Sequence, residues 1–143
     1  MKAKEFYKST AWKWFSKYMK LKLSKNDFII QCATSGKFYQ LPDKRIHLGH
    51  YIKVFDTNNT HFATAFDEKN VLPQSYQDNN YSSGRPDIMR KKLIEMHGLN
   101  EIEKLEIKSK NYCNLGKFEL QLISDEYRNK FNLLATQKGN PWK

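Results

Sequence analysis

A regular pattern of apolar and basic positions runs through the first part of the chain. Apolar side chains recur there at spacings of three and four, at Trp12, Phe15, Tyr18, Met19 and Leu23. Lysines occupy much of the remaining surface, at positions 13, 17, 20 and 22. This spacing places the apolar side chains on one face of a helix. We therefore predict a basic amphipathic helix over roughly residues 3–23.

Three short apolar segments separated by turn signals follow this helix. They cover residues 27–32, 37–41 and 45–52, with Ser35-Gly36 and Pro42-Asp43 between them. Short runs of β-branched and aromatic residues between such signals are typical of strands, so we predict a meander of three strands. Residues 56–60 form a polar loop, and residues 82–86 break the chain before a second helical region.

Helical spacing returns after this break. Met89 and Leu93 mark one helix, with Asp87 as its N-cap and Gly98 as its stop signal. A charged helix follows from about residue 100. A last helix ends before Gly139 and carries Leu120, Ile123, Tyr127, Phe131 and Leu134 at spacings of three and four. The pattern as a whole predicts an α+β fold.

The length of 143 residues suits one domain with a single core. We expect an N-terminal helix over residues 1–25, a core over residues 26–86 and a helical part over residues 87–143. Lys and Arg number 25 against 15 Asp and Glu, which gives a formal net charge of +10 and a pI near 9.5. A basic chain favours a polyanionic partner such as nucleic acid, and a lysine-rich protein without such a partner stays the alternative.

Cysteine use and apolar run length bear on the compartment. Cys32 and Cys113 are too few for a disulfide framework or a four-thiolate zinc site. No run approaches the ~18 apolar residues of a membrane span, and the first residues lack the apolar stretch of a signal peptide. We therefore expect an intracellular, cytoplasmic protein that does not engage a membrane.

Three polar residues occur in the order in which a one-metal nuclease builds its active site. His50 ends a predicted strand, Asn70 follows in a connecting loop, and Asn79 comes next. A neutral imidazole with a pKa of about 6.5 can deprotonate water, so His50 is the candidate base. Asn70 could brace the loop by bonding its backbone and so orient the imidazole. Asn79, helped by Asp78 or His47, could bind one Mg²⁺ or Mn²⁺ ion.

The remaining histidines have simpler interpretations. His97 beside Gly98 suits the capping of a helix end, and His61 in a polar loop suits the surface. For His47 a structural role and metal binding both stay open. Strand alternation points His47 and His50 to opposite faces unless a bulge intervenes.

Basic side chains provide candidate contacts with nucleic acid. Such contacts would hold phosphates without reading bases. Gly49, before His50, would let the backbone approach a phosphate closely. The candidate basic residues are Lys13, Lys17, Lys20, Lys53, Arg85, Arg90 and Lys91.

These residues resemble the phage NinG (Rap) recombination proteins, of the HNH or His-Me finger nuclease superfamily. The similarity covers most of the first hundred residues, and its most specific part is Ala-Thr-x-Phe-Asp-Glu-x-Asn at residues 63–70 after the Gly-His at 49–50. Residues 14–18, 32–37 and 73–74 and Asn79 also contribute. The resemblance implies a ββα-metal core with flanking helices, a divalent metal ion, and nuclease activity on branched intermediates of phage DNA.

The chain departs from the resembled family at several positions, of which two bear on metal binding. The resemblance implies a zinc ion held by two Cys-x-x-Cys pairs, but the matching positions are Cys32 with Ser35 and Ser75 with Asp78. We therefore expect no structural zinc. His47 stands where the family has an aspartate, which leaves the site short of negative charge for Mg²⁺. We expect apolar packing to replace the zinc, with Phe28, Ile30, Phe38, Tyr39, Leu41 and Tyr76 as candidates.

Two functions stay open after this comparison. The first is a metal-dependent DNA endonuclease acting in the phage host on branched or nicked recombination or replication intermediates. The second is a catalytically degenerate HNH fold that serves as a structural or accessory nucleic-acid-binding protein. The missing knuckle cysteines favour the second, and the retained Gly-His and asparagines favour the first. We favour the enzyme, because zinc supports folding and not hydrolysis. A homodimer would suit the symmetric cutting of a junction.

Overall fold

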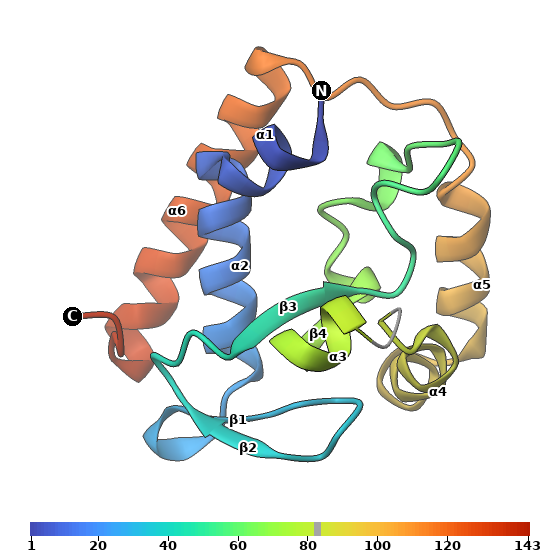
Figure 1. Cartoon of the computed structure of the whole chain (residues 1–143). Coiled ribbons are helices and arrows are strands. Elements are labelled where there is room, and N and C mark those ends of the chain that lie inside the picture. The colour runs from blue at the N-terminus through green and yellow to red at the C-terminus, as the bar shows by residue number, and fades with distance from the viewer. Residues whose placement is uncertain (82–83) are drawn as a thin grey trace.

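The computed structural model describes residues 1–81 and 84–143, and it has the predicted α+β fold. Two groups of helices flank a pair of strands (Figure 1). The first group is α1 (Ala3–Lys8), α2 (Thr10–Leu23) and α6 (Lys117–Lys138), and the second is α4 (Pro86–His97) and α5 (Leu99–Lys108). Between them lie β3 (Ile46–His50), β4 (Val71–Ser75) and α3 (Tyr76–Tyr81).

A hairpin and three short 3₁₀ helices complete the chain. The hairpin is β1 (Ile29–Gln31) with β2 (Phe38–Gln40), and it lies beside the β3–β4 pair (Figure 1). The 3₁₀ helices are η1 (Asn26–Phe28), η2 (Phe62–Thr64) and η3 (Glu68–Asn70). Residues 82 and 83 of the predicted break lie outside the described residues.

The single helix predicted over residues 3–23 is wrong, because the chain breaks at Ser9. Ser9 is extended and caps α2, accepting from the backbone N–H of Trp12 at 3.1 Å. Its hydroxyl also donates to the carbonyl oxygen of Phe6 at 2.6 Å. Serine is a favoured N-cap because its side chain satisfies a backbone donor that a helix start leaves free. The break turns α1 so that Phe6 is fully buried.

The three predicted strands are present, but the predicted meander is wrong because β2 does not pair with β3. β1 pairs with β2, whereas β3 pairs antiparallel with β4, from Ile46 opposite Ser75 to His50 opposite Val71. β4 escapes prediction because Pro73 lies at its centre, and a proline argues against a strand. Here Pro73 serves as an acceptor, since its carbonyl oxygen receives the N–H of Ala33 at 2.8 Å.

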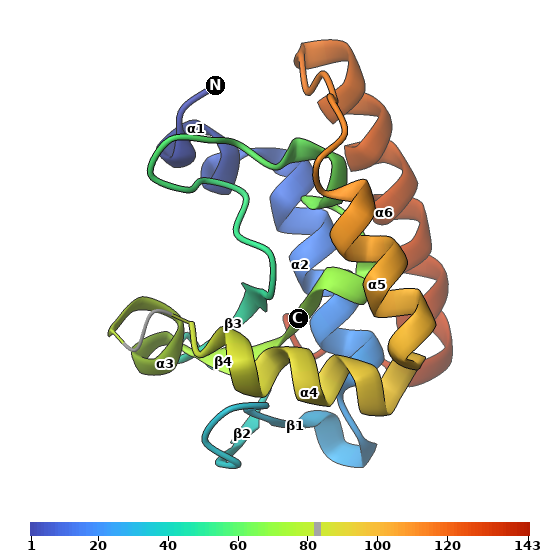
Figure 2. The same ribbon diagram turned by 90° about the vertical axis from the view of Figure 1, so that its right-hand side faces the viewer.

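The two faces of the β3–β4 pair contact different helices. Leu48 and Val71 pack against Phe15 and Met19 of α2 and Tyr127 of α6. On the opposite face, Leu72 packs against α4 and α5, through Met89, Leu93, Ile102 and Leu105. Figure 2 shows these helices from the side. Successive strand residues point to opposite faces, so the pair is buried from both sides and its position is fixed.

The helices after residue 85 are close to those predicted. α4 begins with Pro86 at its first turn, so Asp87 lies inside the helix and is not its N-cap. Gly98 ends α4 with φ 90°, and Gly139 ends α6 with φ 95°, a region that glycine reaches without strain. Within the described residues, no helix is both long and apolar enough to cross a membrane.

Candidate active site

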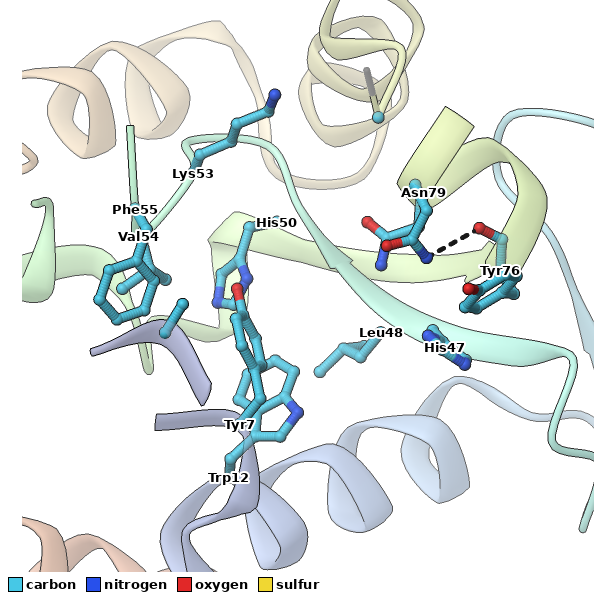
Figure 3. A pocket seen from close by; sticks show the side chains of 13 residues that line it. Tyr7, Trp12, His47, Leu48, His50, Lys53, Val54, Phe55, Tyr76 and Asn79 are labelled. Atoms are coloured by element: carbon cyan, nitrogen blue, oxygen red, sulfur yellow. Dashed lines mark hydrogen bonds between the residues drawn. The ribbon is translucent and has the colours of Figure 1, made fainter. Parts of the chain in front are cut away.

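A cavity of about 540 Å³ lies along β3, and its lining includes three of the five predicted catalytic and metal-binding residues. His47 and His50 come from β3, Asn79 from α3, and Tyr7 and Trp12 from α1 and α2 (Figure 3). The β3–β4 register contains no bulge, so His47 and His50 lie on opposite faces of the strand. Both nevertheless line one cavity, because it reaches around the edge of β3 that does not pair with β4.

His50 is held in one orientation at the end of β3. Its Nε2 lies 2.9 Å from the carbonyl oxygen of Ala65. A carbonyl oxygen only accepts, so Nε2 carries the proton and donates it, and Nδ1 keeps its lone pair. Burial lowers the pKa of His50 to about 4, although the bond to Ala65 opposes this shift. The imidazole is therefore neutral at pH 7 and able to accept a proton at Nδ1.

The N-terminal helices cover this imidazole. The Trp12 ring stacks on it with centroids 4.9 Å apart and an angle of 27° between the planes. Tyr7 approaches from the same side, at 6.4 Å between centroids (Figure 3). Only 9% of His50 is exposed as a result. No sequence pattern indicates this cover, because a tryptophan at helical spacing is indistinguishable from an ordinary core residue.

Asn70 ties together both ends of the loop that follows His50. Its Nδ2 donates to the carbonyl oxygens of Ile52 and Thr64, each at 3.0 Å. Its Oδ1 accepts from the N–H of Ile52 at 2.8 Å. Thr64 adjoins Ala65, the residue that orients His50. This is the geometry that a bracing role for Asn70 requires.

The polar residues before Asn70 anchor the same segment to helices on both sides. Asp67 pairs with Lys108 at 2.8 Å, and Lys69 pairs with Glu101 at 2.6 Å, both on α5. Glu68 accepts from Lys22 of α2 at 2.9 Å and from the hydroxyl of Tyr127 of α6 at 3.0 Å. These contacts hold the segment before Asn70 against α2, α5 and α6, and so fix the position of Asn70.

The three predicted metal ligands do not come together. His47 and Asn79 line the same cavity, and His47 makes an edge contact with the Tyr76 ring at 5.2 Å between centroids (Figure 3). Asp78 points elsewhere: its Oδ2 accepts from Thr34 Oγ1 at 2.6 Å, and its Oδ1 lies 3.8 Å from Arg85. Consecutive residues of a helix point about 100° apart, which separates Asp78 from Asn79.

The remaining donors suit Mg²⁺ poorly. Among the described residues that line the cavity there is no carboxylate, and no described group of three His, Cys, Asp or Glu side chains is placed to hold a metal. Mg²⁺ prefers hard oxygen ligands, whereas an imidazole with an amide oxygen suits Mn²⁺ better. His47 and Asn79 would supply those two ligands.

The four positions of the expected zinc knuckles form a hydrogen-bonded cluster. The Cys32 sulfur accepts from the N–H of Ser35 at 3.4 Å and of Ser75 at 3.2 Å. It also lies 4.0 Å from the Asp78 carboxylate. Burial raises the pKa of the Cys32 thiol, but hydrogen bonds with Ser35, Thr34 and the backbone lower it to about 7. The segments that zinc would join are thus joined by hydrogen bonds.

Apolar packing contributes beside this cluster, as expected for part of the predicted set. Ile30 and Leu41 are buried with Cys32 and Ile46, and Phe28 and Tyr39 pack against them. Phe38 is 64% exposed and Tyr76 is 47% exposed, so neither replaces a zinc site by burial. These two aromatic residues lie on the surface because the hairpin and α3 present them outward.

Gly49 has a structural role that differs from the expected approach to phosphate. A Cβ atom at Gly49 would overlap the side-chain oxygen of Gln74. Gln74 is fully buried and donates to the carbonyl oxygen of Gly84 at 2.8 Å and to Thr34 at 3.2 Å. Glycine is needed here because a buried amide crosses the strand, and no phosphate can occupy that space.

The predicted nucleic-acid-binding residues differ in whether an acidic side chain pairs with their charge. Lys13 and Lys17 lie over the Trp14 ring, each at 5.8 Å, on the outer side of α2. Lys53 lines the cavity, and Lys91 is exposed on α4. Arg85 lies 3.8 Å from Asp78, and Arg90 is engaged by the Glu106 carboxylate at 2.9 Å and 3.1 Å.

The other histidines lie outside the site. His61 Nδ1 is 3.2 Å from the carbonyl oxygen of Ser109 at the end of α5, and His97 is the last residue of α4. No local pattern marks Tyr7 and Trp12 as the cover of His50. Lys20 has the same spacing as the other helix lysines, yet it lines a hollow with His47 and Asn79.

Comparison with known proteins gives one match. No curated protein and no solved structure matches the chain. The family described as Bacteriophage Lambda NinG protein matches residues 1–137, nearly the whole of the 143-residue chain. The chain therefore belongs to the bacteriophage lambda NinG protein family.

Proposed function

We propose that this NinG family member is an endonuclease that hydrolyses the phosphodiester backbone of DNA at the cavity along β3. The observation that carries the proposal is the state of His50. Its Nε2–H donates to the carbonyl oxygen of Ala65, and burial keeps the ring neutral, so Nδ1 can accept a proton. A water molecule that loses its proton to Nδ1 becomes the nucleophile that attacks phosphorus.

The surrounding residues support this assignment. The proposal is supported by the order of β3, the Asn70 loop, β4 and α3, which is the order that a ββα-metal core would have. His50 ends β3, Asn70 ends η3, and Asn79 lies in α3. A divalent cation held by His47 and Asn79 would neutralise charge on the phosphate when bound. We propose Mn²⁺ before Mg²⁺ for this position. Branched or nicked DNA is the proposed substrate.

The alternative is a DNA-binding protein that has lost hydrolysis. The observation in its favour is the displaced Asp78 carboxylate, which leaves the described cavity lining without an acidic side chain. Such a protein would bind DNA with its basic surface and would leave the strands intact.

The decisive experiment compares cleavage of supercoiled plasmid and of labelled branched, nicked and linear duplexes. Each is incubated with Mg²⁺, Mn²⁺ or EDTA and with the wild type, His50→Ala or the control His97→Ala. We expect metal-dependent cutting that falls at least 100-fold in His50→Ala and persists in His97→Ala. Tight, salt-sensitive binding without cutting under any metal would rule out the endonuclease and support the DNA-binding protein.

A further inference from the structure

Lys20 is the basic residue of α2 that reaches the candidate site. Its side chain is half-buried and lines a hollow of about 220 Å³. This hollow shares Tyr7, Trp12, His47 and Asn79 with the larger cavity, so the two adjoin. Lys20 is thus directed to the His47 and Asn79 side of the site, and Lys53 borders the larger cavity.

In the part of the chain that the structure describes, the ammonium group of Lys20 has no acidic neighbour. Within residues 1–81 and 84–143, no carboxylate lies within ion-pairing distance of it. Lys22, two positions along the same helix, is instead paired with Glu68 at 2.9 Å. The Lys20 ammonium lies 5.9 Å from the centre of the Trp142 ring. A partly desolvated charge with no counter-ion attracts an anion strongly.

The groups around Lys20 favour a phosphate as that anion. Asn79 offers an amide donor, and His47 offers an imidazole that faces the positive charge of Lys20. A bound phosphate would neutralise the charge of Lys20 and accept hydrogen bonds from the side chains of Lys20 and Asn79.

We propose that Lys20 binds the backbone phosphate of the nucleic acid in this cavity, beside His47 and Asn79, and does so without a divalent cation. The identity of the anion as a nucleic-acid phosphate rests on the proposed function. In this arrangement Lys20 supplies positive charge where a carboxylate-held cation would otherwise be needed. A cation would then contribute to cleavage more than to binding.

The test uses thymidine 3′,5′-bisphosphate as a small probe, added in EDTA to the wild type and three variants. Histidine side-chain signals in NMR spectra report binding without any cleavage. We expect saturable shifts of the His47 signals in the wild type, in Lys20→Arg and in the control Lys117→Met, which removes an exposed lysine at the start of α6. Lys20→Met should bind at least tenfold more weakly, with unchanged shifts elsewhere showing that it is folded.

Two results would overturn the proposal. One is equal affinity of Lys20→Met and the wild type for the bisphosphate in EDTA. The other is binding by the wild type that begins only when Mn²⁺ is added. The plasmid assay separates this proposal from the proposed function. If the protein binds the bisphosphate through Lys20 but never cuts DNA, the proposed phosphate site stands and the proposed nuclease activity is refuted.

Discussion

The basicity of the His50 imidazole is set by the groups that surround it. Trp12 removes it from water, and Ala65 fixes its proton on Nε2. A depressed pKa keeps the ring neutral over a wide pH range but makes it a weaker acceptor. Phosphate entering the cavity would favour the imidazolium and so strengthen the base at the moment of reaction. The free protein therefore holds His50 neutral and ready.

The first prediction concerns the stability of the free protein in acid. The pKa of His50 is about 4 in the folded chain, against about 6.5 for an unfolded histidine. The unfolded chain then binds more protons between these values, so the free energy of unfolding falls as pH falls from about 6.5 towards 4. At about 1.4 kcal/mol for each pKa unit, the loss from His50 reaches about 3 kcal/mol by pH 4.

Urea unfolding at several pH values checks this prediction. The wild type should lose stability more steeply than His50→Gln, whose side chain does not titrate. His97→Gln serves as the control, because the partly exposed His97 is outside the cavity and should leave most of the pH dependence in place. Identical pH profiles for wild type and His50→Gln would show that His50 is not held neutral by burial.

Asn70 carries the second prediction. Asn70→Ala removes three hydrogen bonds and leaves the N–H and carbonyl of Ile52 and the carbonyl of Thr64 without that partner. Buried groups deprived of partners are costly, so we expect the free energy of unfolding to fall by about 3 kcal/mol. Asn79→Ala, at a half-buried position, should cost less than about 1 kcal/mol. Equal urea midpoints for the two variants would contradict the bracing role.

At the scale of elements, hydrogen bonds join the segments that the family resemblance joins with zinc. Cys32 and Ser35 flank the first turn of the hairpin, and Ser75 and Asp78 span the junction of β4 with α3. The sulfur and carboxylate of this cluster lie 4.0 Å apart, which is close to the separation of two ligands on one zinc ion. The Cys32 and Asp78 side chains are therefore spaced as two ligands of one metal ion would be.

The third prediction is that cysteines restore a zinc site here. The variant Ser35→Cys/Ser75→Cys/Asp78→Cys would supply four thiolates with Cys32, and we expect one Zn²⁺ per chain. Without zinc this variant should be less stable than the wild type, because the Thr34 bond to Asp78 is lost. Zinc should raise its thermal midpoint by about 10 °C, and EDTA should reverse the rise. No stoichiometric zinc in the purified variant would show that the four positions do not converge.

The sequence predicts some elements well and others not, for physical reasons. α6 and the stop of α4 at Gly98 follow from periodicity and a glycine at positive φ. β4 does not, because its pairing with β3 is a contact between distant segments that overrides the proline signal. The break at Ser9 was equally hidden, since Ser9 interrupts no apolar spacing.

The features of the site also divide into those that the sequence predicts and those that it does not. The order of His50, Asn70 and Asn79 was readable along the chain, and the structure brings His50, His47 and Asn79 to one cavity. The direction of Asp78 was not readable, because it depends on the rotation of α3 about its axis. The cover by Trp12 depends on how α1 and α2 pack, which no local pattern specifies.

At the scale of the molecule, a row of lysines on α2 extends towards the cavity. Lys13, Lys17 and Lys20 form one face of the helix, which we term the α2 lysine stripe, and its last member reaches His47 and Asn79. Within the described residues, the ion pairs of other lysines use acidic side chains of η3, α5 and α6, and no ion pair involves a lysine of the stripe. With a net charge of +10, the chain has an unneutralised path along which a DNA backbone could lie.

The fourth prediction tests this path through the salt dependence of DNA binding. Each phosphate neutralised by a lysine releases condensed counterions, so the slope of log K against log salt changes by about 0.9 for each contact. We expect Lys13→Gln and Lys17→Gln each to make the slope about 0.9 less steep, and the pair together about 1.8. Lys104→Gln removes the same charge from α5, where Glu101 lies 3.6 Å away, and should leave the slope unchanged. The measurement is fluorescence anisotropy of a labelled duplex from 50 to 200 mM NaCl, about the range in which such slopes are resolved. A slope that falls equally in all three variants would mean that DNA responds to net charge alone, and the α2 lysine stripe would then have no part in directing the backbone to His50.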